Sequence, residues 1–148
     1  MVRIIPPHEP NLKKRLIKSP KVYIRDSGIL HSLLEIENFD NLMGHPVYGA
    51  SWEGFVIENI LSKLPKWNAS FYRTSSGTEV DLILEKGKKK IAVECKASSA
   101  PQISKGFWNA LEYLAIKEAW IISPVKEKYP IRKNVTVTPL EMFLSTYC

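Results

Sequence analysis

The sequence predicts an α/β protein, an α+β sandwich in which helices flank a mixed central β-sheet. Residues 79–85 and 91–96 alternate apolar residues with other residues, the period-2 pattern of two half-buried strands joined as a hairpin. Residues 47–64 carry apolar residues at helical spacing and stop at Pro65. The predicted order is helix, three strands, helix, two strands and helix, and 148 residues are the length of one domain.

The first 20 residues are expected to form an extended N-terminal arm rather than part of the core. They contain a short basic segment, residues 11–18, with room for at most a helical turn or two, and four prolines surround it: Pro6, Pro7, Pro10 and Pro20. Residues 21–148 are then a single domain, with a helical lead-in at 21–46 and a core at 47–148.

The lead-in is predicted to hold a brief strand, a short helix and a loop. Residues 22–24 suit a strand, and Asp26 with Ser27 can cap a helix that runs to about residue 35. Residues 37–46 are expected to form a loop.

Glu53 is the unexpected residue of the long helix at 47–64. At about 100° per residue it projects into the middle of the apolar stripe, whereas Glu58 lies on the opposite, polar side. A carboxylate in that position needs a partner. Two interpretations follow: Glu53 binds a metal ion, or it pairs with a Lys or Arg at the rim of the core.

A strand at residues 69–73 is followed by a loop at 74–77 that is rich in hydroxyl groups. Arg73, Ser75 and Ser76, with the backbone amides of the loop, could hold phosphate oxygens of a nucleic acid. An ordinary turn is the alternative interpretation of the same residues.

The hairpin is predicted to turn at Gly87 and Lys88, with Gly in the first position as a type II′ turn prefers. This register pairs Glu85 with Lys90, Ile83 with Ala92, Asp81 with Glu94, and Glu79 with Lys96. Asp81 facing Glu94 is destabilising unless a positive charge lies between them, and a divalent cation would supply that charge. Lys96 shares the face of Glu94. The alternative is a solvated face whose charges only confer solubility.

The remainder of the chain supplies the other elements of the sandwich. A helix is expected at 104–114, strands at 118–123 and 135–137, and a closing helix at 139–146. Cys95 and Cys148 have neither the number nor the spacing of a disulfide framework or a zinc site, and Cys95 is expected to be a buried thiol.

The charge of the chain favours a polyanionic partner. The formal net charge is +6, with a sequence pI near 9.3, and Lys88 and Lys89 are part of a basic cluster in the hairpin turn. A solvated basic surface is the alternative. The sequence has neither an apolar run of about 18 residues nor the apolar core of a signal peptide, which predicts a cytoplasmic protein that does not enter a membrane.

Glu53 on a helix, Asp81 on a strand, and Glu94 and Lys96 on the next strand resemble the site of the PD-(D/E)xK nuclease superfamily, which has the restriction-endonuclease-like fold. A narrower resemblance covers nearly the whole chain, to a C-terminal domain of unknown function in prokaryotic AAA-type ATPases. It is carried by Asn11-Leu-Lys-Lys-Arg, Lys21-Val-Tyr-Ile-Arg-Asp-Ser-Gly, Trp52-Glu-Gly-Phe-Val-Ile-Glu-Asn, Arg73-Thr-Ser-Ser-Gly-Thr-Glu-Val-Asp and Val93-Glu-Cys-Lys.

The resemblance implies metal-dependent hydrolysis of a phosphodiester bond in nucleic acid, with DNA favoured. Asp81, Glu94 and Glu53 would bind Mg²⁺ or Mn²⁺, and Lys96 would orient the attacking water. No phosphate-binding Gly-x-x-x-x-Gly-Lys-Ser/Thr loop is present in the sequence, so this chain is not expected to hydrolyse ATP. An ATPase domain or a second copy of the chain is an expected partner. The alternative function is a catalytically inactive module that binds nucleic acid or protein.

Overall fold

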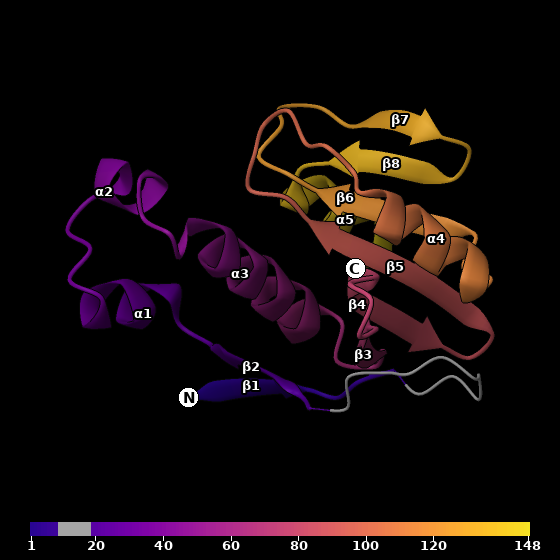
Figure 1. Ribbon diagram of the computed structural model, residues 1–148, viewed down its shortest axis with the longest axis horizontal. Helices are drawn as coiled ribbons and strands as arrows, with labels where there is room; N and C mark the ends of the chain where they lie inside the picture. Colours follow the sequence, from indigo (N-terminus) through magenta and orange to yellow (C-terminus); the bar gives the residue numbers. More distant parts are fainter. Residues whose placement is uncertain (9–18) are drawn as a thin grey trace.

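The computed structural model describes residues 1–8 and 19–148, and Figure 1 shows the arrangement of its elements. The basic segment 11–18 lies outside the described residues. The elements are β1 (Val2–Ile5), β2 (Lys21–Ile24), α1 (Ser27–Leu33), α2 (Phe39–Met43), α3 (Tyr48–Lys63), β3 (Asn68–Arg73), β4 (Glu79–Lys86), β5 (Lys89–Cys95), α4 (Lys105–Tyr113), β6 (Glu118–Ile122), β7 (Tyr129–Arg132), β8 (Val135–Thr138) and α5 (Leu140–Tyr147).

A mixed six-stranded sheet forms the centre, in the order β3-β4-β5-β6-β8-β7. The first three strands pair antiparallel, β6 runs parallel to both β5 and β8, and β7 is antiparallel to β8. Helices lie on both sides of this sheet, with α4 in front and α5 behind in the view of Figure 1. The prediction of a mixed sheet flanked by helices is therefore confirmed.

The predicted hairpin register is also confirmed. Ile83 pairs with Ala92 and Glu85 with Lys90, and Gly87 has a φ of +61° at the first position of the two-residue turn. Continuing this register by one pair beyond Leu82 and Val93 places Asp81 opposite Glu94.

Both faces of the hairpin are buried, which differs from the half-buried strands that the sequence predicted. One face packs against α3 and α5, through residues such as Leu82, Val93 and Ile57, and the other packs against α4. A register shift between β3 and β4 sets two residues, Asp81 and Leu82, opposite Phe71 alone, as in a β-bulge. Val80 therefore packs in the core on the α4 face, whereas unbroken alternation would place it on the same face as Leu82 and Leu84.

Residues 1–8 contain a strand that the sequence did not predict. β1 pairs antiparallel with β2 as a two-stranded ribbon, and Ile5 is 1% exposed within the α3 core. The expectation of an arm outside the core does not hold for Ile5, because its side chain packs among the buried residues of α3. The domain boundary at residue 20 stays a prediction.

Two further elements were missed. The short helix α2 lies inside the predicted loop 37–46, and Asn38 caps it by accepting from the amide of Asn41. β7 has all four residues exposed, so the period-2 signal of a half-buried strand is absent there. Its pairing with β8 is made across a turn in which Asn134 adopts a left-handed φ of 61°.

No helix among the described residues is long and apolar enough to cross a membrane. The cytoplasmic location stays a prediction.

The hairpin turn gives a test of this register. Gly87→Ala should lower the free energy of unfolding by roughly 1–2 kcal/mol, because a Cβ is strained at positive φ. Gly49→Ala is the matched control, since Gly49 lies in α3 with nothing within 4 Å of an added Cβ. It should leave stability unchanged or raise it by up to about 1 kcal/mol. Urea unfolding checks both, and equal effects of the two changes would contradict the assigned turn.

Candidate functional site

Glu53 lies on the face of α3 that meets the β1–β2 ribbon. Its side chain is 22% exposed, and Oε1 accepts hydrogen bonds from Lys21 Nζ, at 2.9 Å, and from the hydroxyl of Tyr23. The helix and ribbon approach closely here, because a Cβ on Gly54 would lie 3.2 Å from the Tyr23 ring. Glu53 thus pairs with a basic residue, as one interpretation expected, and its role as a metal ligand stays a prediction.

Lys21 is the central cation of this site, and the sequence analysis did not assign it a role. Its side chain is only 9% exposed, and Nζ lies 2.9 Å from Glu53, 2.9 Å from Glu79 and 3.6 Å from Asp81. Burial opposes its charge, but the carboxylates outweigh burial and raise the pKa of Lys21. The period of β2, which places Lys21 and Tyr23 on one face of the ribbon, was the available signal.

Asp81 and Glu94 each accept a hydrogen bond from the backbone of the neighbouring strand. Asp81 Oδ2 accepts from the amide of Cys95 at 2.9 Å, and Glu94 Oε2 accepts from the amide of Asp81 at 3.4 Å. The two residues are 6% and 7% exposed. The hairpin and its bulge thus place two buried carboxylates at one point of the sheet.

Burial and mutual repulsion disfavour the ionised forms of this pair. Burial raises the pKa of Asp81, the charge of Glu53 raises it further, and Lys21 opposes both. Burial likewise raises the pKa of Glu94, with a further contribution from Asp81 and an opposing one from Lys96. The pair therefore has less positive charge nearby than two ionised carboxylates require.

Lys96 lies beside this pair on the exposed side. Its Nζ is 3.3 Å from Glu94 Oε1, its side chain is 30% exposed, and its amide donates to the carbonyl of Ile122 in β6. The structure thus connects all four predicted residues: Lys96 contacts Glu94, Glu94 contacts Asp81, and Lys21 joins Asp81 to Glu53.

The residues predicted to bind nucleic acid lie in two separate places. Arg73 pairs with Glu79 at 2.7 Å, the hydroxyl of Ser76 shares a hydrogen bond with that of Thr74, and Ser75 is exposed. Lys88 and Lys89 lie at the other end of the hairpin, about 20 Å away along β4. Lys89 is there within 3.5 Å of Glu118.

Cys95, next to these carboxylates, was predicted to be a buried thiol and is half-buried in the structure. It packs against the α3 core, and burial strongly raises the pKa of its thiol. Neither Cys95 nor Cys148 is in a disulfide.

The fold and the site define a mixed α/β domain with a buried carboxylate pair flanked by two lysines. The chain belongs to the DUF4143 family, a domain of unknown function, which matches residues 48–143. Residues 1–40 match a second family, DUF8612, also described as a domain of unknown function.

Two curated relatives are 36% identical over 146 residues: the uncharacterized proteins Rv2008c of Mycobacterium tuberculosis and Mb2031c of Mycobacterium bovis. The match covers 99% of this chain but 33% of each relative, so the chain spans about a third of their length. A solved assembly of Thermococcus gammatolerans McrB AAA+ hexamers with bound McrC contains a chain with a TM-score of 0.43 and 16% identity. That match covers 62% of this chain and 27% of the other.

The carboxylate pair predicts a pH-dependent effect on stability. The pKa of Glu94 is higher in the folded than in the unfolded state, so ionisation of Glu94 lowers the free energy of unfolding as pH rises through the folded-state pKa. Glu94→Gln removes this destabilisation, which is larger at pH 8 than at pH 5. With EDTA present, the free energy of unfolding of the variant minus that of wild type should be about 1 kcal/mol larger at pH 8 than at pH 5. Thermal unfolding at both pH values checks this, with the exposed change Glu37→Gln as control. A pH-independent difference would contradict the raised pKa.

Proposed function

We propose that this domain is a PD-(D/E)xK-type nuclease with a restriction-endonuclease-like fold, which hydrolyses phosphodiester bonds of nucleic acid with Mg²⁺ or Mn²⁺. The observation that carries the proposal is the pair Asp81 and Glu94, buried and opposed on adjacent strands with Lys96 beside them. A solvated charged face would not bury both carboxylates, and their raised pKa values leave a site that a cation would stabilise.

The donor set suits a hard divalent cation. Mg²⁺ is usually held by one or two carboxylates and keeps several waters, so Asp81 and Glu94 suffice as protein ligands. Among residues 1–8 and 19–148, no group of three or more His, Cys, Asp or Glu side chains could hold a metal ion. Glu53 would accordingly act through water or through Lys21, with which it is paired.

The other side chains have roles that follow from their contacts. When bound, the cation would polarise a phosphoryl oxygen and lower the pKa of a water. Lys96, partly exposed and next to Glu94, can orient a water and stabilise negative charge on the phosphate. Lys21 and Glu53 fix the Asp81 side of the site from the ribbon and α3.

Nicking of supercoiled plasmid tests the proposal. Wild type should nick in Mg²⁺ or Mn²⁺ and not in EDTA, and Asp81→Asn should lower the rate roughly a hundredfold or more, because it removes a ligand while keeping the shape. Asp26→Asn is the matched control, since Asp26 only caps α1. Failure of wild type to nick plasmid and to cut single-stranded DNA or RNA with either metal would reject the nuclease.

Lys21 gives a second test of the same site. Its ammonium lies 3.6 Å from Asp81, so it should repel a divalent cation bound there. Lys21→Met should therefore tighten Mn²⁺ binding about tenfold in calorimetry. Arg25→Met is the control, because Arg25 pairs with Glu58 instead. Weaker binding by Lys21→Met would show that the cation does not occupy the Asp81 site.

A protein-interaction module is the second candidate function, favoured by the outer face of the β1–β2 ribbon. Val2, Ile4 and Val22 are 50%, 61% and 59% exposed there, an apolar face of the kind that marks interfaces. The matched region is about a third of each relative's length. We therefore propose that the remainder of such a longer protein covers this apolar face, and the resemblance implies that this remainder is an ATPase domain.

The separately produced remainder of the Mycobacterium tuberculosis relative is a probe for this face. Wild type should bind it, and Ile4→Lys should bind at least about tenfold more weakly, because a charge replaces an apolar contact. Leu33→Lys, a change at an equally exposed position on α1, is the control. Absence of wild-type binding rejects this occupant, and dimers in sedimentation that Ile4→Lys abolishes would replace it with a second copy of the chain.

A further inference from the structure

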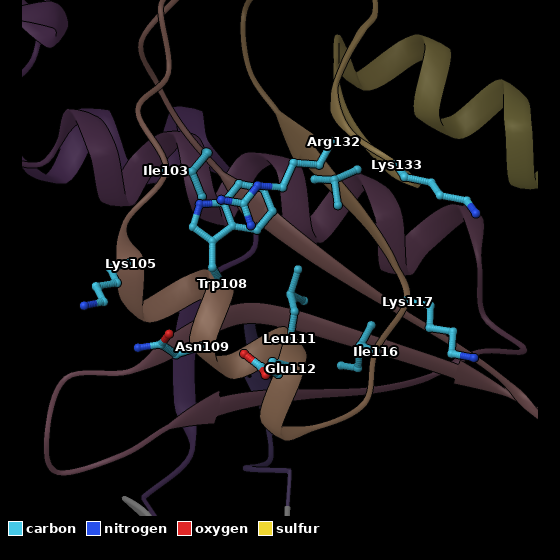
Figure 2. Close-up of a pocket in the computed structure, with 11 residues that line it drawn as sticks. Ile103, Lys105, Trp108, Asn109, Leu111, Glu112, Ile116, Lys117, Arg132 and Lys133 are labelled. Atoms are coloured by element: carbon cyan, nitrogen blue, oxygen red, sulfur yellow. The ribbon is translucent and has the colours of Figure 1, made fainter.

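A groove with an apolar floor lies between α4 and the β7–β8 hairpin, on the face of the sheet opposite α3 (Figure 2). Its volume is about 590 Å³, within the range of ligand sites, which is roughly 300–1,000 Å³. Leu111, Ile116 and Val135 are buried or nearly so at the floor. Four basic side chains and a single acidic one, Glu112, line it; the basic ones are Lys105, Lys117, Arg132 and Lys133.

These four cations line one groove and are not paired with carboxylates of the described part of the chain. All four residues are exposed, and none of their charged groups forms an ion pair with a described carboxylate. Of the thirteen other described Lys and Arg residues, seven lie within 4 Å of a carboxylate: Arg3, Lys21, Arg25, Arg73, Lys89, Lys90 and Lys96. The groove therefore collects positive charge that the protein does not neutralise itself.

A half-buried aromatic ring lies at the centre of this charge. The guanidinium carbon of Arg132 lies 3.8 Å from the centre of the Trp108 ring, and Figure 2 shows the two stacked across the groove from α4 and β7. Trp108 is half-buried and held by an edge-on contact with Phe107. An aromatic plane beside an Arg plane is the usual platform on which an unstacked base lies.

The end of the groove at Lys105 lies where α4 begins, beside the segment that leads into β4. α4 begins at Lys105, and a Cβ on Gly106 would lie 3.5 Å from the Cα of Thr78, the residue before β4. Glu79 and Asp81 follow directly on β4. A chain lying along α4 would thus pass from the groove toward the proposed catalytic residues.

We propose that this groove binds single-stranded nucleic acid, with a base stacked against Trp108 and Arg132 and with phosphates held by Lys105, Lys117 and Lys133. A duplex keeps its bases stacked on one another, so it cannot present one to a ring recessed between a helix and a hairpin. An acidic peptide would use the charge and the floor but not the stacked planes of Trp108 and Arg132. Binding of a single strand in the groove does not depend on the proposed nuclease function. Only the statement that this strand is the substrate rests on that function.

Fluorescence anisotropy of a labelled oligothymidylate in EDTA tests the groove without hydrolysis. Wild type should bind, with an affinity that falls as salt rises. Arg132→Glu and Trp108→Ala should each weaken binding about tenfold or more, and Lys66→Glu, the same kind of charge change at an exposed residue outside the groove, should weaken it far less. Circular dichroism verifies that Trp108→Ala is folded, and Arg132→Glu, at an exposed position, gives the result independently.

Three outcomes would overturn the inference: no binding by wild type, equal losses for Arg132→Glu and Lys66→Glu, or tighter binding of a duplex or of polyglutamate than of the oligothymidylate. Asp81→Asn separates the two proposals, because it should bind the strand like wild type while failing to cut. Binding without any cutting by wild type would reject the nuclease and keep the groove. If wild type does not bind the strand in EDTA, and Arg132→Glu cuts as fast as wild type, the groove is rejected and the nuclease is kept.

Discussion

Carboxylates that share a buried site repel one another unless a positive charge lies between them, and here the ammonium of Lys21 supplies that charge. It reaches Glu53 on α3 and both Glu79 and Asp81 on β4, so one side chain joins a ribbon, a helix and the sheet. Arg3 and Arg25 add a second connection by pairing with Glu58 of α3, and the hydrogen bond from Arg3 is the main reason that the pKa of Glu58 falls to about 2. A two-stranded ribbon is marginal by itself, and these contacts, with buried Ile5, attach it to the domain.

The site is therefore assembled from two segments that match different families. Lys21 and Tyr23 come from the first 40 residues, whereas Glu53, Asp81, Glu94 and Lys96 come from residues 48–143. The carboxylates of the second segment are balanced by a cation of the first. Any change in how the ribbon sits on α3 would alter the charge around Asp81, which couples the position of the N-terminal unit to the chemistry proposed for the core.

The positive charge of the chain is divided between two structural roles. Near the carboxylates the cations are paired and mostly shielded, as Lys21 is, and they stabilise the fold. Along α4 and β7 they are exposed and unpaired with any described carboxylate, as Arg132 is, and can attract an anion. A net charge of +6 alone does not distinguish these roles, because it counts both kinds equally.

The sequence by itself determined the helices and strands of the core, the hairpin register and the opposition of Asp81 and Glu94. These features depend on local periodicity and on a two-residue turn that begins with Gly87, and both can be read along the chain. It also identified Glu53 as a carboxylate in need of a partner, because helical geometry places it in the apolar stripe.

Only the tertiary structure decided which partner Glu53 has, since Lys21 is 32 residues away and no local pattern specifies that contact. The burial of both hairpin faces, the bulge at Asp81 and the groove beside Trp108 likewise arise from the packing of α3, α4 and β7 on the sheet. Such contacts depend on where whole elements meet, which periodicity within one element does not encode.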